Sequence, residues 1–300
     1  MLGRQLVVVT GKGGVGKSTV AAALGLVAAG RGLRTIVAEV ARRDDVSRAL
    51  GGEGMHEEEL APGLHHLSID PEHAMELYLA DQLPAALAEL LGSSRAFSYL
   101  AAATPGMREL LTVGKLWELA QDERRTPGAE RYDLVIVDAP ATGQGIGFLQ
   151  TPRTFANIAR VGPIHSQAQQ LDRFITDQEN TGTAIVALPE EMPVNETMKL
   201  ERDLRDEVGV AVDRVYLNGL YPERFKKSEA EVLAQLAEDE NGAAKAAARA
   251  ALSEHGRAKT QRSQLNRLKR GVEAPVKTLP FLFEPELDVE AARKLAGKLG

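Results

Sequence analysis

The feature that most constrains this chain is a glycine-rich loop near its start, Gly11-Lys12-Gly13-Gly14-Val15-Gly16-Lys17-Ser18. The loop satisfies the pattern G-x-x-x-x-G-K-[ST], which a chain of this composition matches by chance only about once in a hundred cases. The apolar run before it, 5–9, predicts a strand, and the alanine- and leucine-rich run after it, 18–29, predicts a helix. In that setting we expect a phosphate-binding loop rather than an ordinary glycine-rich turn.

Each residue type in the loop has a definite chemical use. The glycines let backbone N–H groups turn toward phosphate oxygens, and the helix that follows presents the positive end of its dipole. Lys17 is expected to reach the β and γ phosphates of a nucleotide, and the Ser18 hydroxyl is expected to ligate Mg²⁺. The candidate nucleotide contacts are therefore the loop from Gly11 to Ser18 and the next residue, Thr19, with ATP and Mg²⁺ as the expected ligands.

Further short apolar runs, each flanked by Gly, Pro or Asp, predict the remaining strands. They are 34–39, 64–69, 133–137, 184–188, 214–217 and 276–279. The first strand, the loop, the helix and the strand at 34–39 form a βαβ unit, which predicts a parallel sheet with a right-handed crossover. Because the strands are apolar on both faces, we expect an α/β fold in which helices cover a mostly parallel sheet.

Between the strands the chain is predicted to be helical. The stretches at about 71–130 and 151–180 indicate an α-helical insertion, with breaks at Pro84, Gly92, Pro105-Gly106 and Gly162-Pro163. The charged, alanine-rich stretch at about 223–270 predicts a helical hairpin. Its late basic residues, 257–270, are more typical of a solvated helix face than of a binding patch. We interpret residues 1–300 as a single nucleotide-binding domain carrying these additions.

Composition excludes several chemistries. With no cysteine in 300 residues, the chain has no disulfide, no thiol nucleophile, no iron–sulfur cluster and no cysteine-ligated zinc.

The net charge of −6 argues against a large non-specific DNA footprint. No segment reaches the roughly 18 apolar residues that span a bilayer, and no secretory leader is evident, so we expect a cytoplasmic protein. The six histidines show no metal-ligand spacing.

Two motifs resemble a known family. The second lysine, Lys12, makes the loop similar to the variant form K-G-G-x-G-K-[ST] found in the ATPase superfamily that includes partitioning ATPases and the arsenite-pump ATPase. The segment Asp138-Ala139-Pro140-Ala141-Thr142-Gly143-Gln144 resembles the D-T-A-P-T-G-H segment of the arsenite-pump ATPase and of its eukaryotic relative that delivers tail-anchored membrane proteins. The chain thus resembles this P-loop ATPase family.

The resemblance implies further roles. Asp138, after the strand at 133–137, would hold Mg²⁺ together with Ser18, and the segment that follows would be a switch acting on the helical insertion. Lys12 would reach across a dimer interface to the partner's phosphates, which a 300-residue chain with one ATPase unit can do only with a second chain. Weaker matches are Ile69-Asp70-Pro71, Pro105-Gly106-Met107-Arg108-Glu109 and Glu196-Thr197, with adenine contacts at Asn218, Pro280 and Phe281.

The chain also departs from the family. Glu39 stands where relatives have the Asp that orients the attacking water, and either Asp44 or Asp45 is an alternative if their loop folds inward. Gln144 replaces the family's His in the switch. The missing cysteines remove the zinc clasp of the tail-anchor targeting dimer and the thiolate arsenite site.

The function expected from these residues is a slow ATPase that works as a dimer, either a homodimer or a pair with a related subunit. Lys12, Lys17 and Glu39 are the candidate catalytic residues, and hydrolysis would rearrange the helical insertion to handle a client. Two alternatives remain open: a partitioning or division-site ATPase that works on DNA or membrane, and a weakly hydrolysing regulatory subunit that binds nucleotide.

Overall fold

A computed structural model describes residues 1–40, 43–54, 56–74, 104–124, 128–239, 242–284 and 288–299. The predicted helix breaks at Pro84 and Gly92 lie outside these residues. Within them, eight strands form one sheet in the order β3-β4-β2-β5-β1-β6-β7-β8. The strands are β1 (Leu6–Gly11), β2 (Thr35–Val40), β3 (Glu58–Ala61), β4 (Leu64–Ile69), β5 (Leu134–Asp138), β6 (Thr181–Ala187), β7 (Arg214–Leu220) and β8 (Val276–Pro280).

The predicted α/β class with a mostly parallel sheet is confirmed. Every neighbouring pair of strands is parallel except β3 and β4, which pair antiparallel at one edge. All seven strands expected from the sequence are present, although β6 begins three residues before its predicted start at 184. The sequence does not predict β3, because only Leu60 among its four residues is strongly apolar.

The strands bury both of their faces, and alternate residues enter two separate cores. Leu6 and Val8 of β1 pack in the core under α6 (Met107–Leu119), α7 (Thr142–Ala159), α8 (Pro163–Thr176), α9 (Glu191–Asp203) and α11 (Ala243–Gly271). Val7 and Val9 enter the opposite core, under α1 (Lys17–Ala29), α2 (Asp45–Ala49) and α12 (Val289–Leu299). This alternation follows from the two-residue repeat of a strand, and it explains the continuous apolar runs in the sequence.

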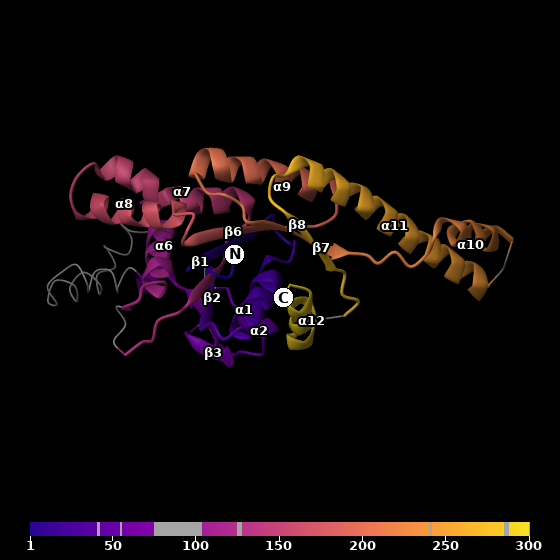
Figure 1. Cartoon of the computed structure of the whole chain (residues 1–300), viewed down its shortest axis with the longest axis horizontal. Helices are drawn as coiled ribbons and strands as arrows, with labels where there is room; N and C mark the ends of the chain where they lie inside the picture. The colour runs from indigo at the N-terminus through magenta and orange to yellow at the C-terminus, as the bar shows by residue number, and fades with distance from the viewer. Residues whose placement is uncertain are drawn as a thin grey trace.

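Helices extend the molecule beyond both ends of the sheet (Figure 1). At one end α6, α7 and α8 pack together. Helices α6 and α8 lie within the ranges predicted for a helical insertion, 71–130 and 151–180, whereas α7 begins nine residues before the second range. At the other end α10 (Lys227–Asp239) packs along α11, whose 29 residues extend for about 43 Å. A short π-helix, Leu204–Val208, continues α9. The division into one domain with these additions stays a prediction.

Candidate functional site

The glycine-rich loop lies where β1 ends and α1 begins, in the middle of the sheet. Gly11 has a φ of 144° and presses against the Val186 carbonyl of β6, so a side chain at this position would collide with backbone. Gly16 has a φ of 90° and lies against the Asn218 side chain, whose Nδ2 donates a hydrogen bond to the Val15 carbonyl over 3.0 Å. The loop therefore requires glycine both for its backbone angles and for its close approach to neighbouring strands.

The two lysines of the loop have different surroundings. Lys17 is buried, and its Nζ donates a hydrogen bond to the Lys12 carbonyl over 3.1 Å. This bond links the two ends of the loop. Burial lowers the pKa of Lys17, an effect that Asp138 opposes. The Lys12 Nζ lies 2.8 Å from Glu196 Oε1 of α9 in an ion pair that is more than one-third exposed. Lys17 is thus placed for phosphate inside the loop, whereas Lys12 stands at the surface.

Ser18 and Asp138 meet although 120 residues separate them. Asp138 ends β5, which pairs with β1, so its carboxylate faces the first turn of α1. The Ser18 hydroxyl donates to Asp138 Oδ2 over 2.6 Å, and Asp138 Oδ1 is buried without a hydrogen-bond partner. One hydroxyl and one carboxylate, both hard oxygen donors, fit a Mg²⁺ ion that takes its other ligands from water and phosphate. The structure therefore brings together both of the predicted metal ligands.

Arg43 is a third member of this cluster, and the sequence analysis did not single it out. Its guanidinium donates to Ser18 Oγ over 3.0 Å and lies 3.6 Å from Asp138 Oδ2. It also pairs with Asp45. The only signal in the sequence is a basic residue shortly after the second strand, which cannot be told from an ordinary surface arginine without the fold.

Replacing Asp138 with asparagine is expected to stabilise the ligand-free protein at about pH 7.5 by about 3 kcal/mol in the free energy of unfolding. Burial raises the pKa of Asp138 from 3.8 to about 6. Between these values the folded state holds more protons than the unfolded state, so the stability of the wild type falls as pH rises. Asparagine has no charge to bury, so the gain should be smallest near pH 4 and largest above pH 6. Urea unfolding across this range measures it, and a gain independent of pH contradicts the prediction.

Glu39 lies next to Asp138 in the sheet, because β2 and β5 pair in parallel with these two residues in register. Its carboxylate is fully buried. Oε2 accepts hydrogen bonds from the Val46 N–H over 2.9 Å and shares a 2.8 Å contact with His66 Nε2, while Oε1 has no hydrogen-bond partner. One oxygen of Glu39 is therefore held in place, and the other is buried without a hydrogen-bond partner.

The alternatives to Glu39 lie at the start of α2 and are already paired. Asp44 Oδ1 lies 3.1 Å from Arg48 Nε, and Asp45 pairs with both Arg43 and Arg48. Both carboxylates are more than one-third exposed. Their loop does not place either of them as deep in the sheet as Glu39.

The candidate adenine contacts lie at the ends of β7 and β8. Asn218 is in β7 and contacts the loop as described, while Pro280 ends β8 opposite Leu220. Phe281 stacks on Tyr221 with ring centroids 4.6 Å apart, and Phe283 packs against both rings edge-on. Phe281 and Phe283 are partly exposed. Together with Tyr221 they form an aromatic platform close in sequence to Asn218, which contacts the glycine-rich loop. Tyr221 and Phe283 were not predicted as site residues, although aromatic residues following two strand ends are visible in the sequence.

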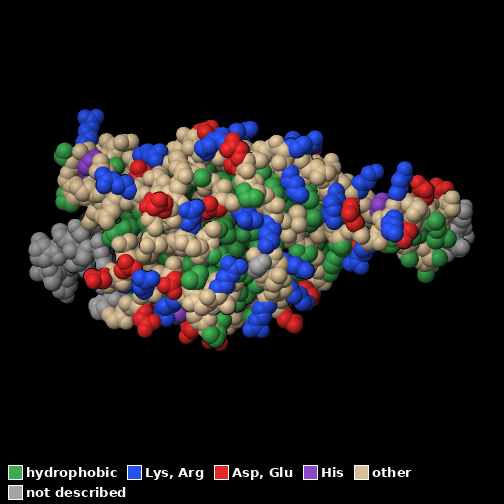
Figure 2. Space-filling view, in the orientation of Figure 1, with side chains coloured by type: hydrophobic (Ala, Val, Ile, Leu, Met, Phe, Trp, Pro, Cys, Tyr) green, Lys and Arg blue, Asp and Glu red, His purple; other side chains and the backbone are tan. Residues whose placement is uncertain are grey.

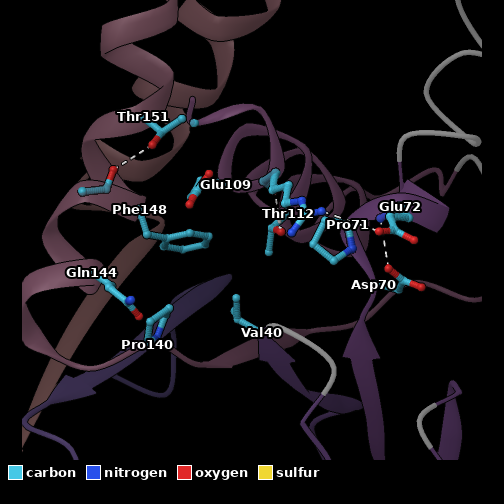
Figure 3. Close-up of a pocket in the computed structure, with 13 residues that line it drawn as sticks. Val40, Asp70, Pro71, Glu72, Glu109, Thr112, Pro140, Gln144, Phe148 and Thr151 are labelled. Carbon is cyan, nitrogen blue, oxygen red and sulfur yellow. Dashed lines mark hydrogen bonds and ion pairs between the residues drawn. The ribbon is translucent and has the colours of Figure 1, made fainter. Parts of the chain in front are cut away.

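The segment after Asp138 leads into α7 and borders a cavity of about 570 Å³ (Figure 3). The Phe148 ring points into this cavity, and Pro140 and Gln144 lie below it. The opposite wall comes from α6 and from the chain after β4. The lining residues are Val40, Asp70, Pro71, Glu72, Gly106, Arg108, Glu109, Thr112, Pro140, Gln144, Gly147, Phe148 and Thr151. Three matches noted from the sequence, at 69–71, 105–109 and 138–144, thus converge on one cavity.

Basic side chains are prominent along α11 (Figure 2), and several of them have partners within the chain. Arg262 pairs with Glu223, Arg267 donates to Asn195, and Arg257 donates to the Tyr221 hydroxyl. This pairing is typical of a solvated helix face. Among the described helices, none combines the length and the apolar character needed to cross a membrane.

Comparisons with known proteins identify the family of the chain. The family model described as "Anion-transporting ATPase" matches residues 4–171 and 157–246. The protein named ATPase BagA from Mycobacterium tuberculosis is 30% identical over 248 residues, which cover 79% of this chain and 71% of that protein. Arsenical pump-driving ATPases from Acidiphilium multivorum and Escherichia coli are 25% and 24% identical over 241 residues, 74% of this chain but 40% of each relative.

Proposed function

Since the chain belongs to the anion-transporting ATPase family, we propose that it binds Mg²⁺ and ATP and hydrolyses ATP slowly as a dimer. The observation that carries this proposal is the meeting of Lys17, Ser18 and Asp138 around one glycine-rich loop. Such a loop, at the carboxyl ends of parallel strands and at the start of a helix, is suited to phosphate. A phosphate-release assay with the full chain, with and without Mg²⁺, tests it.

The roles follow from position. The backbone N–H groups of the loop and the Lys17 ammonium would bind the phosphates, and Ser18 with Asp138 would hold Mg²⁺. The chemistry supplied by bound Mg²⁺ is the neutralisation of charge on phosphate oxygens. Asn218 and the aromatic platform would frame adenine, because a base stacks on exposed rings. Tight nucleotide binding without turnover would instead favour a regulatory subunit, and no binding would overturn the proposal.

We propose that Glu39 orients the attacking water through Oε1, since Oε2 is held by Val46 and His66. Phosphoryl transfer depends mainly on positioning and electrostatics, so the longer side chain of glutamate remains suitable.

Replacing Glu39 with glutamine is expected to lower turnover about 100-fold while leaving the affinity for nucleotide nearly unchanged. Asp44→Asn is the matched control, because it removes a carboxylate from the nearby exposed loop, and it should change turnover by less than about twofold. Steady-state phosphate release and nucleotide titration measure the two effects. Equal losses in the two variants would contradict the role of Glu39.

The segment 138–144 suggests how nucleotide state is coupled to the binding of a client. Pro140 and Gln144 belong both to the segment after Asp138 and to the wall of the cavity. We propose that a shift of this segment with nucleotide state changes the cavity and the packing of α6 and α7. Arsenite bound by thiolates is not proposed as the client, because the chain contains no cysteine.

A further inference from the structure

The Arg43 guanidinium lies against both oxygen donors that we assign to Mg²⁺. Its Nη2 donates to Ser18 Oγ over 3.0 Å, and its Nη1 lies 3.6 Å from Asp138 Oδ2. A Mg²⁺ ion binds such oxygens at about 2.1 Å in near-octahedral geometry. A bound Mg²⁺ ion would use the Ser18 Oγ lone pair that accepts the hydrogen bond from Arg43 in the ligand-free chain. The guanidinium and the metal ion therefore compete for the same atoms.

The charges around Arg43 explain why a cation belongs there. Asp138 and Glu39 are both buried and face each other on neighbouring strands. Two buried carboxylates side by side repel, and a nearby positive charge offsets that repulsion. The Arg43 guanidinium lies 3.6 Å from Asp138 Oδ2, the buried Lys17 ammonium is a second positive charge near Asp138, and His66 contacts Glu39. Arg43 is thus a cation held beside this pair of carboxylates in the ligand-free chain.

The position of Arg43 also connects the site to α2. Its Nε donates to Asp45 Oδ2 over 2.9 Å, and Asp45 is the first residue of α2. The next residue, Val46, donates its N–H to Glu39. If Arg43 leaves Ser18, it can keep its partly exposed ion pair with Asp45. Its displacement would then move the start of α2 and would not leave the guanidinium without a partner.

We propose that Arg43 is an internal cation that holds Ser18 and Asp138 in the ligand-free chain and is displaced when Mg²⁺ and nucleotide bind. The inference rests on the proposed Mg²⁺- and ATP-binding function and adds a positioning residue to it. Because displacement costs free energy, Arg43 lowers the affinity for the metal and couples its binding to a movement of α2.

The test uses Mn²⁺ with a fluorescent ADP analogue on the full chain and two readouts. Arg43→Gln should lower the Mn²⁺ concentration at half-saturation about tenfold, because a competitor held by a charge-assisted hydrogen bond is gone. It should also lower the Tm of the ligand-free chain by about 3 °C. Arg43→Lys keeps the charge and should restore most of the Tm. Arg48→Gln is the control, because Arg48 lies in α2 and, among the described residues, forms its ion pairs with Asp44 and Asp45; it should change neither readout.

The outcomes separate the two proposals. Wild-type chain that binds no Mn²⁺ with the ADP analogue overturns both the proposed function and the role of Arg43. Wild-type binding with an unchanged or higher half-saturation in Arg43→Gln overturns the role of Arg43 alone. An equal fall in Tm for Arg48→Gln and Arg43→Gln also overturns it, because the effect would then be a general property of arginines paired with Asp45.

Discussion

Replacing Lys17 with alanine is expected to lower the rate of ATP hydrolysis by roughly 10³-fold. Lys17 is the buried ammonium inside the loop, and its bond to the Lys12 carbonyl already points it across the loop's mouth. Removal takes away a fixed positive charge from the place where phosphate charge accumulates, in surroundings with little water to screen it. Phosphate release measures the rate, and titration with a fluorescent ATP analogue measures the accompanying loss of affinity.

The control for this variant is Lys115→Ala. Lys115 is also largely buried and ion-paired, to Glu118 over 2.7 Å, but it lies in α6 rather than in the loop. The Lys115→Ala variant should lower the thermal stability of the chain without a comparable loss of turnover. Thermal unfolding of both variants separates misfolding from lost chemistry. A folded Lys17→Ala chain with the turnover and affinity of the wild type would contradict the phosphate-binding role of the loop.

Replacing Lys12 with alanine is expected to lower turnover about 10³-fold, the effect of losing a cation supplied by a partner chain. In the single chain the Lys12 ammonium lies in a partly exposed ion pair with Glu196, while only its backbone carbonyl contacts Lys17. Exposed pairs of this kind contribute about 0–1 kcal/mol, so opening it to reach a partner's phosphates costs little. The structure thus leaves Lys12 available for a contact in trans, which stays a prediction.

Mixing two inactive variants distinguishes a trans lysine from a lysine that acts within its own chain. In a heterodimer of Lys12→Ala and Lys17→Ala, the site with an intact Lys17 receives an intact Lys12 from the other chain. Equal mixing makes half of the dimers heterodimers with one working site each, so activity should recover to about one quarter of wild type. Light scattering with ATP confirms the dimer. Heterodimers without activity would show that Lys12 does not act across the interface.

Much of the fold follows from local pattern. The strand runs, the βα turn with its glycines and the helical stretches are readable because burial on two faces leaves continuous apolar segments. The edge strand β3 was not predicted because half of its residues are glutamates, which break the apolar pattern of a buried strand. The candidate metal ligands were also predictable, since strands that run parallel bring their carboxyl ends to one edge of the sheet.

The glycine-rich loop and the class of fold can be read from local sequence, because both depend on residues close together in the chain. The spacing of Gly11, Gly16 and Lys17 predicts a phosphate-binding turn, and the apolar runs predict strands that are buried on both faces. The long-range pairs appear only in the folded chain: Arg43 with Asp138, Lys12 with Glu196, and Tyr221 with Phe281. The partner of a charged or aromatic side chain far away in the chain cannot be inferred from the residue itself, so such pairs can be identified only when strand order and register are known.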